Sequence, residues 1–206
     1  MSGFNKQELR LRLRASRKAI PQAANAAAAQ RLCALVCSLS SFQHAQRMAF
    51  YWPHDGEIST IPLISSALAQ HSQCFLPVLV LDAKQQLAFA AYTLDTPMVP
   101  NRYGILEPEL SFAYLCEVSD LDLIFVPVVG FDSQGQRLGM GGGYYDATFA
   151  SNLRLKSKDK SPQIIGLAYS CQHVEQLPTE NWDWSLNAVV TEDKVYNFKK
   201  AQPHSC

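Results

Sequence analysis

The sequence predicts an α/β fold in layers, with a mainly parallel central sheet flanked by helices. Short apolar runs alternate with segments of helical periodicity, which is typical of strand–helix–strand units. The run LDLIFVPVVGF (121–131) is almost continuously apolar, as expected for a strand buried on both faces of a parallel sheet. The 206 residues are 48% hydrophobic and 17% charged, so we expect one globular domain over 1–206.

The N-terminal part of the chain is expected to be helical. Asn5 is a suitable N-cap and Pro21 a stop signal for a helix over 5–20, which we expect to pack on the rest of the domain. The Ala-rich segment 22–38 predicts a second helix. The inner face of this helix is expected to carry Leu32, Leu35 and Val36.

The next elements are a strand and a helix. The segment MAFYW (48–52) predicts a short strand that leads into the loop PHDGE. Residues 60–71 predict a helix with Thr60 as its cap and Pro62 in its first turn, where proline is tolerated.

Two further strands are predicted by CFLPVLVL (74–81) and QLAFAAYT (86–93), joined by a turn around Asp82. The stretch that follows is rich in residues that interrupt regular structure, and we expect it to be irregular. These residues are Pro97, Pro100, Gly104 and Pro108.

The C-terminal half is expected to complete the sheet. After the apolar strand, GQRLGMGGGYYDATFASNL predicts a glycine-rich loop followed by a helix. IIGLAYS (164–170) and NAVVTE (187–192) predict the last two clear strands, with a short helix around HVEQL (173–177) between them.

Charge and cysteine usage limit the class of protein. Lys+Arg and Asp+Glu both number 18, so no net charge attracts the chain to nucleic acid or to a membrane. The six cysteines form no CxxC pair, the first residues lack the apolar core of a secretion signal, and no apolar run would span a membrane. A mitochondrial transit peptide is the alternative for the basic N-terminus, but Glu8 and the continuous helical pattern favour a structural helix. We therefore expect a cytoplasmic protein with reduced thiols.

The densest chemical signal is the segment RLGMGGGYYD, with four glycines among positions 139–143. Without β-carbons, such a loop can turn its N–H groups toward an anion, and the helix that follows adds the positive end of its dipole. The flanking Arg137 can neutralise a phosphate, and Asp146 can hold a metal ion. The loop is neither a P-loop nor GxGxxG, because Tyr144 stands where the last glycine would be. A flexible turn without a ligand is the alternative interpretation.

The first helix carries Lys6, Arg10, Arg14 and Arg17 within an arc of roughly 80° at about 100° per residue. A charge run of this kind is usually a solvated face, and we interpret Arg12 and Lys18 in that way. For Lys6 and Arg10 a triphosphate becomes the better interpretation once the resemblance described below is taken into account.

Three further residues are candidates of lower specificity. Trp52 offers a stacking surface for a flat heterocycle, and Glu57 an acceptor for ring N–H donors, although a core tryptophan and a surface glutamate are the simpler interpretation. Asp183 lies between Trp182 and Trp184, where a carboxylate is costly unless it is paired or binds a metal. The histidines show no metal-ligand spacing, and no nucleophile motif such as GxSxG is present.

Together these segments resemble the 5-formyltetrahydrofolate cyclo-ligase family. The resemblance covers KQELR (6–10), DGEIST (55–60), the stretch 122–149 with RLGMGGGYYD, and the stretch 165–192 with WDWSLNAVVTE, in the order of the family. It implies ATP, Mg²⁺ and a folate substrate, without a nucleic-acid or membrane partner. The implied reaction converts 5-formyltetrahydrofolate to 5,10-methenyltetrahydrofolate and releases ADP and phosphate, through phosphorylation of the formyl oxygen.

The resemblance also implies roles for particular residues. Metal-binding roles fall on Asp146 and Asp183, and catalytic roles on Arg137, Tyr144 and Asp146. Folate contacts fall on Trp52, Glu57, Gly139, Gly141, Gly143 and Tyr144. ATP contacts fall on Lys6, Arg10, Arg137, Leu138, Gly139, Met140, Gly141, Gly142, Gly143, Tyr144 and Tyr145.

One departure concerns Gly142, because many relatives carry a lysine there. Arg137 or Arg14 is the candidate to supply that charge. The residues alone also allow a sugar-phosphate isomerase, a CoA-transferase-like enzyme or a non-catalytic nucleotide or sugar-phosphate sensor on the same architecture. The sequence leaves open the oligomeric state (a monomer is compatible with it), the preference for polyglutamylated folates, and whether 94–118 form a lid over the folate.

Overall fold

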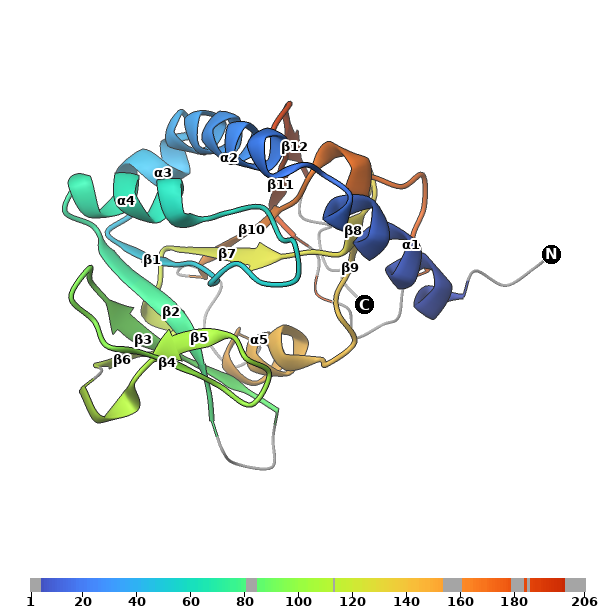
Figure 1. Ribbon diagram of the computed structural model, residues 1–206. Helices are drawn as coiled ribbons and strands as arrows, with labels where there is room; N and C mark the ends of the chain where they lie inside the picture. Colours follow the sequence, from blue (N-terminus) through green and yellow to red (C-terminus); the bar gives the residue numbers. More distant parts are fainter. Residues whose placement is uncertain are drawn as a thin grey trace, which may run out of the picture.

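The computed structural model describes residues 5–80, 85–112, 114–153, 161–178, 184 and 186–198. Their centre is an eight-stranded sheet in the order β12-β11-β10-β7-β1-β2-β3-β6 (Figure 1). The strands are β1 (Arg47–Ala49), β2 (Gln73–Leu79), β3 (Leu87–Tyr92), β6 (Leu115–Cys116), β7 (Leu123–Pro127), β10 (Gln163–Leu167), β11 (Ala188–Val190) and β12 (Val195–Asn197). Neighbours from β11 to β2 pair in parallel, and β12, β3 and β6 are antiparallel additions at the two edges. The predicted α/β class with a mainly parallel sheet is confirmed.

Helices cover both faces of this sheet (Figure 1). On one face lie α2 (Gln22–Cys37), α3 (Ser40–His44) and α4 (Ile61–Ala69), and their apolar side chains form a core with β1, β7 and β10. On the other face, α5 (Tyr144–Leu153) inserts Phe149 among Phe75, Phe89 and Ile124. Burying apolar surface on both sides explains why β7 is apolar throughout.

The first helix packs at one end of the sheet. Helix α1 (Lys6–Lys18) begins where predicted, because the Asn5 side chain accepts a hydrogen bond from the backbone N–H of Gln7. Its buried Leu9 and Leu13 contact Leu138, next to the short strands β8 (Gly130–Phe131) and β9 (Arg137–Leu138). This contact places the N-terminal half of α1 beside the glycine-rich loop.

Two local predictions differ from the structure in whole or in part. Thr60 occupies the N-cap position of α4 as predicted, but its hydroxyl donates to the carbonyl oxygen of Tyr51 at 2.7 Å and makes no cap bond. Around HVEQL there is no helix; a 3₁₀ turn, η4 (Ser170–Gln172), precedes it. The N–H of Val174 donates to Phe131 and that of Leu177 to the Asp132 carboxylate, so these donors are not available to a helix.

The stretch after β3 is more regular than predicted. It forms the hairpin β4 (Met98–Pro100) and β5 (Leu106–Pro108), the 3₁₀ turns η1 (Leu110–Phe112) and η2 (Val118–Asp120), and edge strand β6. Strand β12 was also not predicted, strand β1 ends at Ala49 rather than at position 52, and the turn around Asp82 lies outside the described residues.

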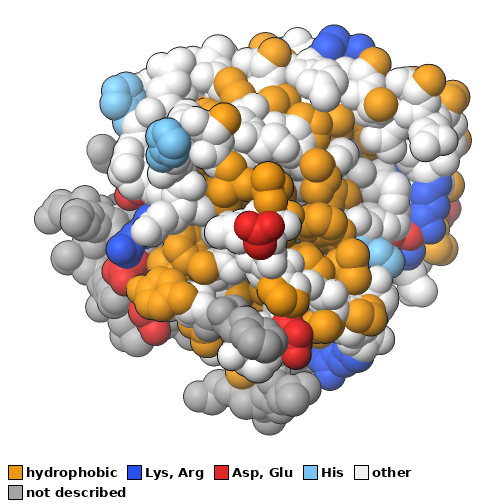
Figure 2. Space-filling view, turned by 60° about the vertical axis from the view of Figure 1, so that its left-hand side comes forward, with side chains coloured by type: hydrophobic (Ala, Val, Ile, Leu, Met, Phe, Trp, Pro, Cys, Tyr) orange, Lys and Arg blue, Asp and Glu red, His pale blue; other side chains and the backbone are white. Residues whose placement is uncertain are grey.

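The side of the molecule that carries β3 and β6 shows many hydrophobic side chains at its surface (Figure 2). Exposed large hydrophobic residues of 94–115 are Leu94, Val99, Tyr103, Leu106, Leu110, Tyr114 and Leu115. None of the described helices is long and apolar enough to cross a membrane. The cysteines of the described part, Cys33, Cys37, Cys74, Cys116 and Cys171, are all free thiols.

Candidate active site

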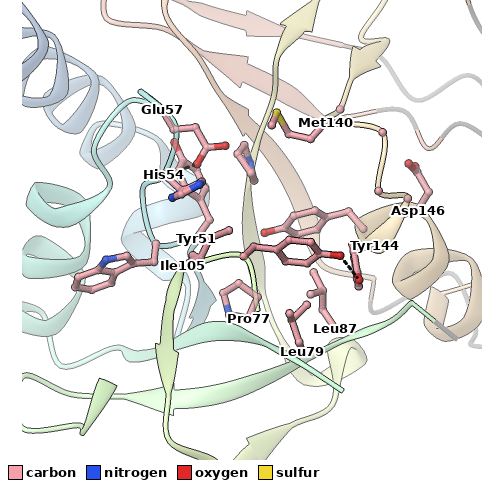
Figure 3. A pocket seen from close by; sticks show the side chains of 18 of the residues that line it. Tyr51, His54, Glu57, Pro77, Leu79, Leu87, Ile105, Met140, Tyr144 and Asp146 are labelled. Carbon is pink, nitrogen blue, oxygen red and sulfur yellow. Dashed lines mark hydrogen bonds between the residues drawn. The ribbon is translucent and has the colours of Figure 1, made fainter. Parts of the chain in front are cut away.

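A cavity with a volume of 660 Å³ gathers segments that are far apart in the sequence. Its walls come from α1, the loop after β1, strands β2 and β3, the β4–β5 hairpin and the glycine-rich loop before α5 (Figure 3). The predicted residues that line it are Lys6, Arg10, Trp52, Glu57 and every residue from 137 to 146. Asp183 lies outside the described residues. The location agrees with the rule that ligands of open α/β sheets bind beyond the carboxyl ends of the strands.

The glycine-rich loop has a backbone that a residue with a side chain would rarely adopt. Gly141 and Gly143 have φ angles of +98° and +69°, in the region that favours glycine. A Cβ added at Gly139 or Gly143 would meet no atom within 4 Å, so these positions leave open space beside the backbone. The loop leads directly into α5, whose first turn begins at Tyr144. The arrangement is suited to an anion at a helix N-terminus.

Helix α5 is held firmly at this position. Phe149 is buried in the core, and the Thr148 hydroxyl accepts a hydrogen bond of 2.8 Å from the N–H of Leu87 in β3. The same hydroxyl donates to the carbonyl oxygen of Tyr144 at 2.7 Å. The end of the glycine-rich loop therefore has a fixed anchor on the sheet.

Arg10 connects α1 to the loop. Its Nε donates to the carbonyl oxygen of Gly139 at 2.8 Å, and both residues line the cavity. Lys6, one helical turn earlier, lines the same wall. Two cations of α1 therefore lie beside the loop.

The next cations of α1 have a different partner, Asp55. Arg14 Nε and Arg17 Nη2 contact one carboxylate oxygen of Asp55 at 2.8 and 2.9 Å, and Lys18 forms an ion pair with the other oxygen. Hydrogen bonds from Arg14, then from Lys18, hold the pKa of Asp55 well below its usual range. Arg14 is thus committed to Asp55 and does not line the cavity. The expectation that it supplies charge near Gly142 is wrong. Lys18 is 52% exposed, as expected for a solvated side chain, and its ammonium group also pairs with Asp55.

Arg137 and Asp146, which flank the loop, are joined to each other. Arg137 Nη2 donates to Asp146 Oδ1 at 2.5 Å, and Nη1 donates to the carbonyl oxygen of Trp184 at 3.0 Å. The Arg137 side chain is 6% exposed and that of Asp146 is 35% exposed. Among the described residues, no group of three or more His, Cys, Asp or Glu side chains could hold a metal. Because Asp183 lies outside the described residues, Asp146 is the one predicted metal ligand that the structure describes.

Glu57 is a largely buried carboxyl in the wall of the cavity, with its side chain 11% exposed. Burial raises its pKa to about 7, against the opposing effects of Arg17 at 3.8 Å and of the hydrogen bond from the His54 N–H at 3.1 Å. Trp52 lines the same wall and packs on Tyr92, with ring centroids 6.0 Å apart. A carboxyl poised between its neutral and charged forms can accept hydrogen bonds from a ligand that stabilises its anion.

Several lining residues were not predicted from the sequence. From the loop after β1 come Tyr51 and His54, and from the β4–β5 hairpin Asn101, Tyr103, Ile105, Leu106 and Glu107. Glu107 Oε2 accepts hydrogen bonds from Leu79 N–H at 3.1 Å and Asn101 Nδ2 at 3.0 Å, which fixes the hairpin against β2. The available signal was the Asn and Gly of NRYGILEP, which are typical of a hairpin turn.

Comparisons with known proteins agree with this geometry. Residues 3–192 match the sequence model of the 5-formyltetrahydrofolate cyclo-ligase family. The chain is 40% identical over 186 residues to 5-formyltetrahydrofolate cyclo-ligase of Haemophilus influenzae, covering 90% of this chain and 97% of that one. It is also 40% identical over 154 residues to the Escherichia coli K12 enzyme of that name, covering 75% and 82%. The structure of Aquifex aeolicus 5,10-methenyltetrahydrofolate synthetase superposes with a TM-score of 0.79 at 27% identity, covering 98% and 96%.

Proposed function

The chain belongs to the 5-formyltetrahydrofolate cyclo-ligase family, and on this premise we propose that it converts 5-formyltetrahydrofolate into 5,10-methenyltetrahydrofolate with ATP and Mg²⁺. The observation that carries the proposal is one cavity in which a glycine-rich anion loop and two cations face a buried carboxyl and an apolar wall. A nucleotide and a flat heterocycle need these two surfaces side by side. Because the chain belongs to this family, we no longer favour the sugar-phosphate isomerase, the CoA-transferase-like enzyme or the non-catalytic sensor.

The folate would lie along the wall that contains Glu57. The Glu57 carboxylate would accept hydrogen bonds from N–H groups of the pterin ring, and Trp52 would cover a face of that ring. The aminobenzoyl ring would follow the apolar strip of Pro77, Leu79, Leu87 and Ile105. Hydrogen bonds to the ionised form would lower the pKa of Glu57 when the substrate binds.

The triphosphate would lie against the glycine-rich loop. The open space at Gly139 and Gly143 and the start of α5 fit phosphate oxygens, which would accept hydrogen bonds from loop N–H groups. Lys6 and Arg10 would add positive charge from α1. ATP supplies the phosphoryl group that turns the formyl oxygen into a leaving group.

Magnesium would be held by Asp146, with Asp183 as its second proposed protein ligand. Mg²⁺ commonly binds through one or two carboxylates together with phosphates and water, so a third-exposed carboxylate beside the loop fits this ion. Arg137 would fix the orientation of Asp146 through Oδ1 and place its own charge next to the phosphates. Tyr144, at the junction of loop and helix, would contact both ligands.

No protein nucleophile is needed for the ring closure. The substrate nitrogen at position ten attacks the formyl carbon of the same molecule, so the protein contributes by holding the two atoms together and by stabilising charge. Closure of the cavity by α1 and the hairpin would keep water from competing with this attack.

An absorbance assay tests the proposal. Purified protein with 5-formyltetrahydrofolate, ATP and Mg²⁺ should produce the near-ultraviolet band of the methenyl product. The band should be absent without ATP and should be lost when EDTA removes the metal. If no band formed while ATP still raised the melting temperature, the chain would bind a nucleotide without catalysing this reaction.

A further inference from the structure

Glu57 follows a tight turn in the loop between β1 and α4. Asp55 and Gly56 have φ angles of +52° and +76°, and the N–H of Glu57 donates to the carbonyl oxygen of His54 at 3.0 Å. A non-glycine residue in this left-handed region is uncommon, and aspartate is among the residues that tolerate it best. Contacts from outside the loop must therefore hold this turn, and with it the position of Glu57 in the cavity wall.

Arg17 of α1 holds this turn. Its Nε donates to the backbone carbonyl oxygen of Asp55 at 3.0 Å, and its Nη2 donates to the carboxylate of the same residue at 2.9 Å. The Arg17 side chain is buried, and its planar guanidinium suits such a two-point contact. Helix α1 is thereby fixed to the loop two residues before Glu57.

The same guanidinium faces Glu57. Nη2 of Arg17 lies 3.8 Å from Glu57 Oε1, while Glu57 Oε2 accepts a hydrogen bond of 3.1 Å from the N–H of His54. A carboxylate offers about four acceptor positions, so these two contacts leave positions for a ligand in the cavity that Glu57 lines. Arg17 does not line the cavity itself. It therefore lies behind Glu57 as seen from the ligand.

Arg17 opposes the effect of burial on Glu57. The groups that interact electrostatically with this carboxyl are Arg17 of α1, Tyr145 of α5, and Tyr51, Asp55 and the His54 N–H of its own loop. Burial raises the pKa of Glu57 to about 7, Arg17 has the largest opposing effect, and Asp55 adds to the rise. Without Arg17, the neutral form of Glu57 would therefore predominate at neutral pH.

We propose that Arg17 is a positioning residue for the substrate, whose charge keeps Glu57 in the ionised form that accepts hydrogen bonds from the pterin ring. The inference rests on the proposed function. A protonated carboxyl has fewer acceptor positions and forms weaker hydrogen bonds, so it would bind the ring N–H groups less well. Because Arg10 of the same helix contacts the glycine-rich loop at Gly139, α1 would serve both the nucleotide and the folate.

The test is a double-mutant cycle on Arg17→Gln and Glu57→Gln, with kcat and KM for 5-formyltetrahydrofolate measured at about pH 6, about pH 7.5 and about pH 9 in saturating ATP. Arg17→Lys, alone and with Glu57→Gln, is a second variant that keeps a cation in case Arg17→Gln does not fold. The control is Arg14→Gln. Arg14 contacts the same Asp55 carboxylate, but no ion pair joins it to Glu57 in the described part of the chain. Melting temperatures verify that each protein is folded in the assay.

For Arg17→Gln we expect KM at about pH 7.5 to rise roughly threefold, because losing the cation moves the titration of Glu57 upward by about one pH unit. At about pH 9, where Glu57 is ionised in both proteins, KM should return to within about twofold of the wild type. In the Glu57→Gln background, Arg17→Gln should change KM by less than about twofold at every pH. Arg17→Lys should lie between the wild type and Arg17→Gln, kcat should stay within about twofold, and Arg14→Gln should follow the wild-type profile.

Three results would overturn the inference. An unchanged pH profile in the folded Arg17 variants would mean that Arg17 only stabilises the fold. An equal rise in KM at every pH would mean that it acts through the shape of the loop and not through its charge. Additive losses in the cycle would mean that it does not act through Glu57. Turnover by the wild type tests the proposed function separately, so the two failures are distinguishable.

Discussion

Two clusters of arginine and aspartate in this molecule share the same chemistry but differ in their surroundings. Around Asp55, Arg14, Arg17 and Lys18 surround one carboxylate whose side chain is 10% exposed. Around Asp146, the one ion pair in the described residues is with Arg137, and 35% of the carboxylate side chain is exposed. The first cluster joins α1 to the loop after β1, and the second lines the cavity.

From this difference we propose that the first cluster serves stability and the second serves the ligand. Three cations more than neutralise Asp55, and Arg17, 1% exposed, depends on it for a counter-charge. Asp146 has one neighbouring cation and an open side, so it can take a second cation such as Mg²⁺. Substitutions at the two aspartates should therefore separate folding from catalysis.

The largest effect is expected for Asp146→Asn. Removing the carboxylate charge would remove the proposed metal ligand, so kcat should fall about a thousandfold, the loss of one major electrostatic contribution. The amide oxygen can still accept from Arg137, so the free energy of unfolding should change by less than about 1 kcal/mol. Steady-state assays and urea denaturation measure the two quantities. Activity within a few-fold of the wild type would contradict the metal role of Asp146.

Asp55→Asn should show the opposite behaviour. It would leave the buried Arg17 without its nearest charge and lower the free energy of unfolding by about 3 kcal/mol. Because the folded-state pKa of Asp55 is lowered, its stabilisation is present above the usual aspartate pKa and fades as pH falls through the acid range. The urea midpoints of wild type and variant should therefore converge toward acid pH.

The matched control is Arg14→Gln, which removes a 34% exposed partner of the same carboxylate and should cost about 1 kcal/mol or less. The kcat of Asp55→Asn should stay within a few-fold of the wild type at a temperature where the protein is folded. A loss below 1 kcal/mol for Asp55→Asn would show that Glu57 alone satisfies Arg17.

The two clusters also show which features of the structure could be predicted from the sequence and which could not. The strands with strong apolar patterns, the Asn5 cap and the glycine-rich loop were predicted from local signals that the structure retains. The helical spacing of Lys6, Arg10, Arg14 and Arg17 could not show which of these cations face the cavity and which contact another part of the chain. That change depends on Asp55, which is distant in the sequence and meets α1 only after folding.

The β4–β5 hairpin, which forms one wall of the cavity, is the main feature that was not predicted from the sequence. Strands β4 and β5 have three residues each, too short for alternation to be recognised among prolines. Their position depends on Glu107, whose bond to Leu79 in β2 is a tertiary contact. The position of Tyr103 in the cavity wall follows from this placement and has no local signature.

Glu57 lies between the Asp55 cluster and the cavity. The smallest of the predicted effects is the change in substrate affinity as this carboxyl gains or loses its proton. It contacts Arg17 of the Asp55 cluster at 3.8 Å, yet it lines the cavity. Its pKa is raised to about 7, so the free protein is increasingly protonated as pH falls below that value, whereas the pterin requires the ionised acceptor. KM for 5-formyltetrahydrofolate should therefore rise roughly eightfold from about pH 7.5 to about pH 6, in proportion to the lost ionised fraction.

Glu57→Gln should have a higher KM at about pH 7.5 but no such rise, because the amide does not titrate in this range. KM for ATP should not show this dependence on pH. His54→Asn, which alters the neighbouring lining residue and keeps Glu57, is the control and should keep the wild-type slope. If the slope persisted in Glu57→Gln, Glu57 would not be the group that sets the pH dependence of KM, and it would belong with the Asp55 cluster as a structural residue.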